Sequence, residues 1–600
     1  MELDHNFANA ALPLQKTAQC VPAQRERPSE VSAQHRKTSH YHRPMERPFL
    51  AEERDKVTIL FGGFTWKHER LIEAILRASG YRCQRLPTPD LEAFTFGREY
   101  GNNGQCNPTY FTVGNLIKFL RSMEDKGSSR AEIIEKYVFF SAGSCGPCRF
   151  GMYESEYRLA LQNAGYEQFR IILYQADQAF KAAADNPGLK FTLDFNLDAL
   201  NMLNLGDVIN DLSYRIRPFE AVPGSTDRAI ADVVDQLSHF LEIHRRFEIL
   251  ERAPAWLAAP LRRTPRLTGF LNATGKILDH LYSADFVGQM HEARRRLDEV
   301  EVDHTRIKPV VKIVGEFWAQ LTEGDGNFHM FSFLESEGAQ VHVDSIGGWI
   351  SYLLHQARIS MEAKEGLDDP YPEARWWQPG KRLANVWKYG RKRSLLRLSE
   401  VLWSYLYART VRHMGGITPR LLSQRELARL AHPFYDTQAR GGEGHLEVGK
   451  NVYYTTQGLC HMVLALKPFG CMPSSQSDGV QSAVVNRFPE MIFLPVETAG
   501  EGEISAQSRV QMALGEARVK ARAEFDAALA STGKSLAGIK EYVAMNRSLR
   551  SPFYPIPRRR GIAGRGANFV LHAGDLMDGR ATLARMPGEP RKASQSFDRR

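Results

Sequence analysis

The sequence predicts a parallel α/β protein with a helical insert, and three observations lead to this fold class. Short apolar runs, such as VTILFGGF at 57–64 and EKYVFFSAGS at 135–144, alternate with stretches of helical periodicity. Several of the helical stretches end in glycine, which is typical of helix C-termini. Strands that alternate with helices at this spacing form parallel sheets. With 600 residues and 43% apolar composition, the chain can bury several cores.

Composition and periodicity divide the chain into six parts. The first and last are polar, with little periodicity, and we expect both to be disordered. The expected parts are a lead at 1–54, an α/β unit at 55–224, a helical insert at 225–305, a second α/β unit with helices at 306–430, a third α/β unit with helices at 431–550, and a basic tail at 551–600.

The formal net charge of +9 is concentrated at the two ends of the chain. Residues 1–50 carry +2 and residues 551–600 carry +6, which leaves +1 for the 500 residues between them. A protein that follows nucleic-acid phosphates needs its cations clustered on a folded face, so we expect no nucleic-acid partner. No run of 18 apolar residues and no signal-peptide pattern is present, so the expected location is the cytoplasm, with no membrane partner.

The stretch SCGPCRFGMYE places Cys145 and Cys148 two residues apart, between a predicted strand and a predicted helix. One interpretation is a thioredoxin-type dithiol, because a helix N-terminus lowers the pKa of the leading thiol. A second is part of a structural zinc site, which usually takes its ligands from two short-spaced pairs. The motif alone is compatible with both.

Two further cysteines lie in similar surroundings and favour a third interpretation. Cys106 and Cys471 each lie in a loop with glycine and proline, ahead of a helical stretch. One close pair and two single cysteines from distant loops suit an iron–sulfur cluster held between units. Cys20, Cys83 and Cys460 are expected to be bystanders.

Ligands of parallel sheets bind beyond the carboxyl ends of the strands, and polar residues follow one predicted strand closely. Glu316 comes directly after VVKIVG, and Trp318, Asn327 and His329 follow it. These residues either face a substrate or cap a helix and fill a domain interface. GHLEVGKN at 444–451 resembles a phosphate-binding loop, but Asn451 replaces the required Ser or Thr, so a flexible glycine loop is expected.

Four blocks of the sequence resemble a known family. GREYGNNGQCNPTYFTVGNLIKFL, SCGPCRFGMYE, VGEFWAQLTEGDGN with FLESEGA, and LKPFGCMPSS occur in this order within residues 56–550. They are similar to conserved blocks of proteins related to 2-hydroxyacyl-CoA dehydratases and to the large domain associated with the CoA-enzyme activases. The resemblance implies flavodoxin-like or Rossmann-like units around a [4Fe–4S] cluster held by Cys106, Cys145, Cys148 and Cys471.

The resemblance also implies a function and partners. The protein would be a dehydratase-like lyase or its electron-transfer component, acting in low-potential electron transfer or in the dehydration or reduction of an acyl-CoA. The ATPase motifs of the activators are not found in this chain, so a separate ATP-dependent activator with its own cluster is expected. Four ligands, where dehydratases use three, point to a closed cluster. A homo-oligomer is compatible with all of this.

Overall fold

The computed structural model describes residues 46–143, 148–174, 186–190, 192–244, 247–367, 369–371, 373–439 and 443–583. The chain divides into Met1–Glu46 and Arg47–Arg600, and the described helices and strands all belong to the second unit. Residues 1–45 of the lead expected at 1–54 lie outside the described residues. The end of that lead is ordered, contrary to expectation, because Phe49 is buried in a core with Ile59 and Val138. None of the described helices is long and apolar enough to cross a membrane.

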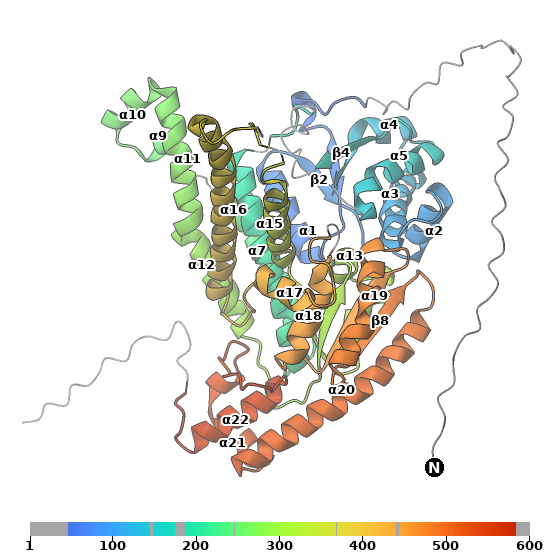
Figure 1. Ribbon diagram of the computed structural model, residues 1–600, viewed down its shortest axis with the longest axis vertical. Helices are drawn as coiled ribbons and strands as arrows, with labels where there is room; N and C mark the ends of the chain where they lie inside the picture. The colour runs from blue at the N-terminus through green and yellow to red at the C-terminus, as the bar shows by residue number, and fades with distance from the viewer. Residues whose placement is uncertain are drawn as a thin grey trace, which may run out of the picture. The chain divides into compact units, whose positions relative to one another are not determined.

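The first sheet has four strands, and all neighbouring strands are parallel, in the order β2-β1-β3-β4 (Figure 1). Side chains alternate between the two faces of a strand. Ile59 and Val138 therefore pack in one core, and Leu60 and Phe139 in another. The strands are β1 (Thr58–Phe61), β2 (Arg82–Arg85), β3 (Tyr137–Ala142) and β4 (Arg170–Tyr174), and the helices are α1 (Trp66–Ala78), α2 (Leu91–Tyr100), α3 (Asn107–Asp125), α4 (Arg130–Lys136) and α5 (Tyr153–Asn163).

The second sheet repeats this pattern, with four parallel strands in the order β6-β5-β7-β8. All residues of β5 and β7 are buried, as expected for central parallel strands. The strands are β5 (Val310–Gly315), β6 (Gln340–His342), β7 (Met462–Pro468) and β8 (Phe493–Thr498), and the associated helices are α13 (Phe317–Leu321), α14 (Met330–Ser336), α15 (Ile346–Lys364), α17 (Gln424–Ala431), α18 (His445–Thr456), α19 (Met472–Arg487) and α20 (Glu503–Thr532).

The predicted fold class, parallel α/β with helical regions, is confirmed by these two sheets. The number of sheets differs from expectation, because the second and third predicted units share one. β7 pairs with β5 over Val311–Gly315, although about 150 residues separate the two strands in the chain. The stretch GHLEVGKN lies in α18 and the turn before it, not in a flexible loop.

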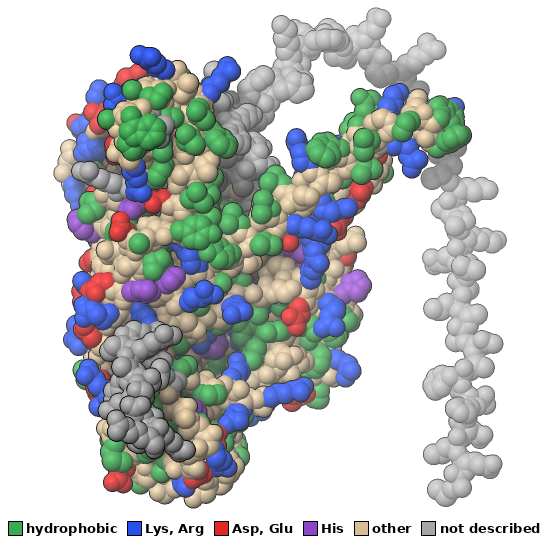
Figure 2. All heavy atoms as spheres, turned by 90° about the vertical axis from the view of Figure 1, so that its left-hand side faces the viewer, with side chains coloured by type: hydrophobic (Ala, Val, Ile, Leu, Met, Phe, Trp, Pro, Cys, Tyr) green, Lys and Arg blue, Asp and Glu red, His purple; other side chains and the backbone are tan. Residues whose placement is uncertain are grey.

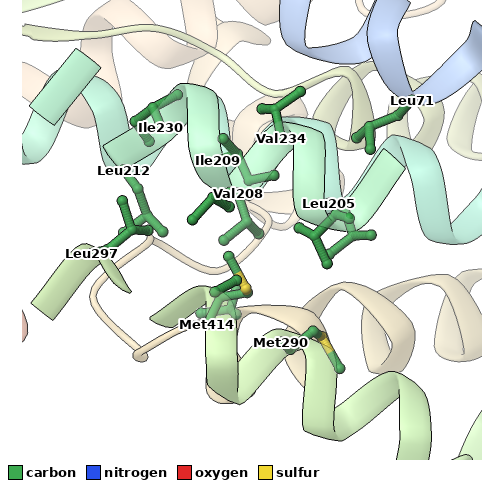
Figure 3. Packing of buried hydrophobic residues seen from close by; sticks show 14 of the residues in the cluster. Leu71, Leu205, Val208, Ile209, Leu212, Ile230, Val234, Met290, Leu297 and Met414 are labelled. Atoms are coloured by element: carbon green, nitrogen blue, oxygen red, sulfur yellow. The ribbon is translucent and has the colours of Figure 1, made fainter. Parts of the chain in front are cut away.

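A helical layer packs around α7, which touches both α/β units. Figure 3 shows side chains from α1, α7, α8 and α12 pointing toward one another, including Leu71, Leu205, Ile230 and Met290. The carboxylate of Asp207 on α7 accepts hydrogen bonds from the first amides of α15. The helices are α7 (Leu193–Ile216), α8 (Ser225–Ile243), α9 (Ile249–Arg252), α10 (Ala255–Arg262), α11 (Pro265–Tyr282), α12 (Ala284–Asp298) and α16 (Pro379–His413). Helices α8 to α12 lie within the expected insert.

The C-terminal segment differs from the disordered tail expected at 551–600. α22 (Arg565–Met577) packs with α20 and with α21 (Leu536–Met545) in a core that contains Phe525, Ile539 and Phe569. The expectation was wrong because it rested on the composition of the whole segment. The arginine-rich stretch before α22 dominates that composition, although the apolar run ANFVLHA follows it. The chain is described as far as residue 583.

Helices α2 and α3, which flank Cys106, approach each other at two glycines. A Cβ atom on Gly114 of α3 would overlap the carbonyl oxygen of Ala93, and one on Gly97 of α2 would overlap that of Tyr110. Backbone atoms cannot move aside as a flexible side chain can. The pair of glycines therefore fixes how α2 and α3 pack, and with it the loop that carries Cys106.

We predict that Gly114→Ala lowers the free energy of unfolding by about 1–3 kcal/mol, the usual cost of overpacking. Urea unfolding followed by circular dichroism measures the change. Gly515→Ala in α20 is the matched control, because no atom lies within 4 Å of the added methyl group. The control should be unchanged or more stable, since alanine favours helix more than glycine does. A destabilisation no greater for Gly114→Ala than for the control would contradict the role of this contact.

Candidate functional site

Cys106 lies directly before the first residue of α3 and is buried. Its sulfur is 3.1 Å from the hydroxyl oxygen of Thr109 and 3.3 Å from that of Tyr153. Burial raises the pKa of this thiol, and the two hydroxyls offset part of that rise. Cys106 is therefore a protonated, hydrogen-bonded thiol in the metal-free protein.

The loop before Cys106 is held by one buried carboxylate, Glu156 on α5. Glu156 accepts hydrogen bonds from the backbone amide of Asn102 at 3.2 Å, its side-chain amide at 2.9 Å, and the side-chain amide of Gln105 at 2.9 Å. A buried charge is stable only with such partners. The polar stretch GNNGQ is thereby fixed in place, and Cys106 with it.

Cys148 precedes the short helix Arg149–Met152, which leads into α5. Cys145, its partner in the CGPC motif, lies outside the described residues, as do residues 144–147 as a whole. The Arg149 guanidinium donates to the carbonyl oxygen of Gly104, so the segment that follows Cys148 is bonded to the loop of Cys106. Burial raises the pKa of the Cys148 thiol to about 12.

Cys471 follows β7 of the second sheet and precedes α19. Its loop meets that of Cys106, because the Asn107 amide donates to the carbonyl oxygen of Phe469 at 3.1 Å. Gly470 has φ of 75°, and a Cβ there would lie 3.3 Å from the Cα of Cys106. Only glycine accommodates both this backbone conformation and this approach. The two single cysteines of the sequence analysis therefore lie on adjoining loops from different sheets.

Two carboxyl groups lie at the start of α13, beyond the end of β5: Glu316, which is partly exposed, and Glu443, which is buried. Glu316 accepts from the amide of Ala319 at 2.9 Å, and Glu443 accepts from the amide of Phe317 at 2.7 Å. Burial raises the pKa of Glu316 to about 7. Burial, together with the charge of Glu316, raises that of Glu443 to about 8. Both groups can exchange a proton near neutral pH.

The carboxyls and the described thiols form one electrostatic cluster. Burial is the largest cause of the raised pKa values of the Cys106, Cys148 and Cys471 thiols. The negative charge of Glu316 raises the three pKa values further. Glu443 acts on the last two in the same way. Such effects require proximity, so all three thiols lie near Glu316, and Cys148 and Cys471 also lie near Glu443.

Cysteine thiolates bind both zinc ions and iron–sulfur clusters. Among the described residues, from which Cys145 is missing, no three His, Cys, Asp or Glu side chains form a group able to hold a single ion. A cluster of four irons spreads its thiolate ligands over several metal atoms. The three described thiols also sit at helix starts, where backbone amides favour anionic sulfur. Thiols at the starts of separate helices are ligands of the kind that such a cluster uses.

The remaining residues singled out in the sequence have structural roles. Trp318 stacks on Phe111 at 5.6 Å between ring centroids, which joins α13 to α3. The Asn327 side chain donates to the carbonyl oxygen of Ala319 at 2.8 Å, and His329 pairs with Asp325 at 2.9 Å. Of the two interpretations for this stretch, the contacts of these three side chains fit capping and interface packing. Cys83 and Cys460 pack against strand cores.

Sequence reasoning missed Glu443, Tyr153 and Glu156. Glu443 stands in the glycine-rich stretch RGGEGH, where an isolated acid ahead of a helix is a weak signal of a buried carboxyl group. Tyr153 and Glu156 lie five and eight residues beyond Cys148, in the first turn of α5. Their separation from Cys106 in the chain conceals that they face its loop.

No family model matches the chain, and no curated protein is significantly similar to it in sequence.

We predict that the two carboxyls make the metal-free protein less stable as pH rises. An unfolded glutamate has a pKa of 4.5, whereas in the folded state the values are about 7 and about 8. Between pH 5 and 8 the unfolded chain releases protons that the folded chain retains, so the free energy of unfolding falls. Glu316→Gln/Glu443→Gln should exceed the wild type in stability at pH 8 by roughly 2 kcal/mol or more, at about 1.4 kcal/mol per pKa unit.

Urea unfolding at pH 5 and pH 8 measures this difference. Glu501→Gln, at an exposed position, is the control and should follow the wild type at both values. Equal pH dependence in the wild type and the double variant would show that neither carboxyl retains its proton.

Proposed function

We propose that the protein binds a [4Fe–4S] cluster through Cys106, Cys145, Cys148 and Cys471. The proposed function is low-potential electron transfer, or the dehydration or reduction of an acyl-CoA. The observation that carries the proposal is the meeting of thiol-bearing segments at the starts of helices: the loop of Cys106 is hydrogen-bonded to the loop of Cys471 through Asn107, and to the segment after Cys148 through Arg149. Soft thiolates at separated helix termini are the ligands that such clusters use.

The two alternatives from the sequence receive less support. In a dithiol oxidoreductase the leading thiol has a lowered pKa. That thiol, Cys145, lies outside the described residues, and the pKa of its partner Cys148 is raised. A zinc scaffold needs ligands gathered around one ion, and the described residues hold no such group. An electron-transfer or acyl-CoA function also fits a buried site that excludes water.

The chain's own residues would serve the site in three ways. When bound, the cluster would supply one-electron reduction at low potential. Amides at the starts of α3 and α19 would stabilise negative charge on sulfur. Glu316 and Glu443, close to neutrality in pKa, would hold protons beside the thiols and could pass them to a substrate. Glu156 would hold the loop of Cys106 in place, and Asn107 would keep it against the loop of Cys471.

The partners follow from the family resemblance alone. We propose an acyl-CoA substrate and a separate ATP-dependent activator protein with its own cluster as electron donor. A cytoplasmic location would keep the four thiols reduced and available as ligands.

We predict about four irons and four acid-labile sulfides per chain after anaerobic purification, with an absorption band near roughly 400 nm that bleaches on reduction. Cys106→Ser and Cys471→Ser should each lose most of the iron, because each removes a ligand from a different loop. Cys460→Ser is the control, since that cysteine lies beside the second sheet, as Cys471 does, but is only partly buried and packs against Val463 and Ala465. It should retain the wild-type iron content.

Three results would contradict the proposal. Protein free of iron after anaerobic reconstitution would exclude a cluster. Zinc in place of iron would favour the scaffold. Full disulfide-exchange activity in Cys106→Ser and Cys471→Ser, with no metal bound, would favour the dithiol enzyme.

A further inference from the structure

The first half of α16 stands largely uncovered. Of the buried residues of this 35-residue helix, all but Tyr389 lie between Trp403 and Val411. Tyr389 and Trp403 face α15, where they donate to the carbonyl oxygens of Lys364 and Gly347 at 2.9 and 3.0 Å. One apolar face of α16 is therefore packed against the protein.

A second apolar face of α16 has no cover in the described part of the chain. Five large side chains recur at spacings of 4, 11, 3 and 4 residues, which return to the same side of a helix with 3.6 residues per turn. Their exposed fractions run from 44% to 69%, far above those of core residues. The five are Leu383, Trp387, Leu398, Val401 and Tyr405. An apolar stripe of this length is unusual on a surface that meets only water.

The same segment is strongly basic. Between Pro379 and Arg397 the sequence has seven Lys or Arg residues and no Asp or Glu: Lys381, Arg382, Lys388, Arg391, Lys392, Arg393 and Arg397. In the preceding loop, the Arg375 guanidinium lies 5.1 Å from the ring centroid of Trp377, so cations and aromatic rings are interleaved. Whatever covers the stripe must accept both apolar side chains and a high positive charge.

Helices α10 and α11 present a similar surface. Leu267, Phe270, Leu278 and Tyr282 on α11 are all at least half exposed, and Trp256 on α10 is 76% exposed. The sequence from Ala255 to Leu278 contains arginines but no acid. Figure 2 looks onto the side where Figure 1 places α11 and α16, and shows apolar and basic side chains next to each other at its upper end.

The positive charge of this surface distinguishes between two candidates for what covers it, a second copy of the chain and an anionic membrane. A second copy of the chain would bring two basic helices together, and like charges across an interface cost several kcal/mol. An anionic bilayer accepts both features, because apolar side chains enter the boundary below the headgroups while Lys and Arg reach the phosphates. Tryptophan prefers this boundary, and four of the eight tryptophans are exposed here: Trp256, Trp376, Trp377 and Trp387.

We propose that α16, together with α10 and α11, binds peripherally to the surface of an anionic membrane. The sequence analysis expected no membrane partner because no segment could span a bilayer. A helix that lies on the surface needs no spanning segment. This inference is independent of the function proposed for the thiols.

Co-sedimentation of the full-length protein with vesicles tests the proposal. Vesicles of equal parts phosphatidylglycerol and phosphatidylcholine should bind the protein, and phosphatidylcholine alone should bind it much less. Binding should weaken as salt is raised. Arg391→Glu/Lys392→Glu should reduce binding about tenfold or more, at about 1 kcal/mol for each cation near the surface.

A second variant tests the apolar stripe, and a matched one tests for nonspecific effects. Trp387→Ser/Leu398→Ser should also lose binding, with its circular dichroism spectrum unchanged because both side chains are exposed. Ile504→Ser/Met512→Ser removes equally exposed apolar groups from α20 and should bind as the wild type does. Equal loss in this control would overturn the proposal, as would equal binding to both vesicle types. Failure of the wild type to bind vesicles, with a dimer in sedimentation velocity that Trp387→Ser/Leu398→Ser abolishes, would assign the stripe to a second copy.

Discussion

The buried side chain of Asn107 joins the two sheets at the point where the rest of the site is assembled. Its backbone amide donates to Phe469 and its side-chain amide donates to the carbonyl oxygen of Thr498, at 2.6 Å. Both acceptors belong to the second sheet, whereas Asn107 follows Cys106 in the first unit. Because an unpaired buried amide is costly, these bonds admit one arrangement of the loops. The positions of Cys106 and Cys471 depend on that arrangement. So does the close approach of their two loops, which requires glycine at position 470.

The parts of this molecule that the sequence could predict are those set by local chemistry. Strands such as VTILF and the glycine-ended helices follow from short patterns, and so does the placement of Cys148, Glu316 and Cys471 after strands. Two outcomes depended on contacts that no local pattern encodes. The pairing of β5 with β7 joined two predicted units into one sheet, and the packing of α22 on α20 ordered a segment whose composition is basic. The proximity of Glu443 to Glu316 is of the same kind, because about 125 residues lie between them.

Charge averaged over a long chain conceals its distribution in space. Residues 51–550 are almost neutral overall, yet the first nineteen residues of α16 carry seven cations and no acid. The acids that balance these cations in the formal charge lie elsewhere in the sequence. A field of this kind acts within about one Debye length, roughly 8 Å at physiological salt. The local surface of α16, and not the net charge, therefore determines which partners it attracts.

The shared strand order of the two sheets gives each position in one an equivalent in the other. β3 and β7 are both the third strand of their sheet in chain order, so the CGPC loop and the Cys471 loop are counterparts. The glycines after β1 and the Gly315–Glu316 pair after β5 correspond in the same way. The site thus lies between two halves of common strand order that differ in content: the first contributes Cys106 and the CGPC pair, the second Cys471 and the two carboxyl groups. A substitution on one side of the site therefore has no chemical equivalent on the other, although the two backbones follow the same plan.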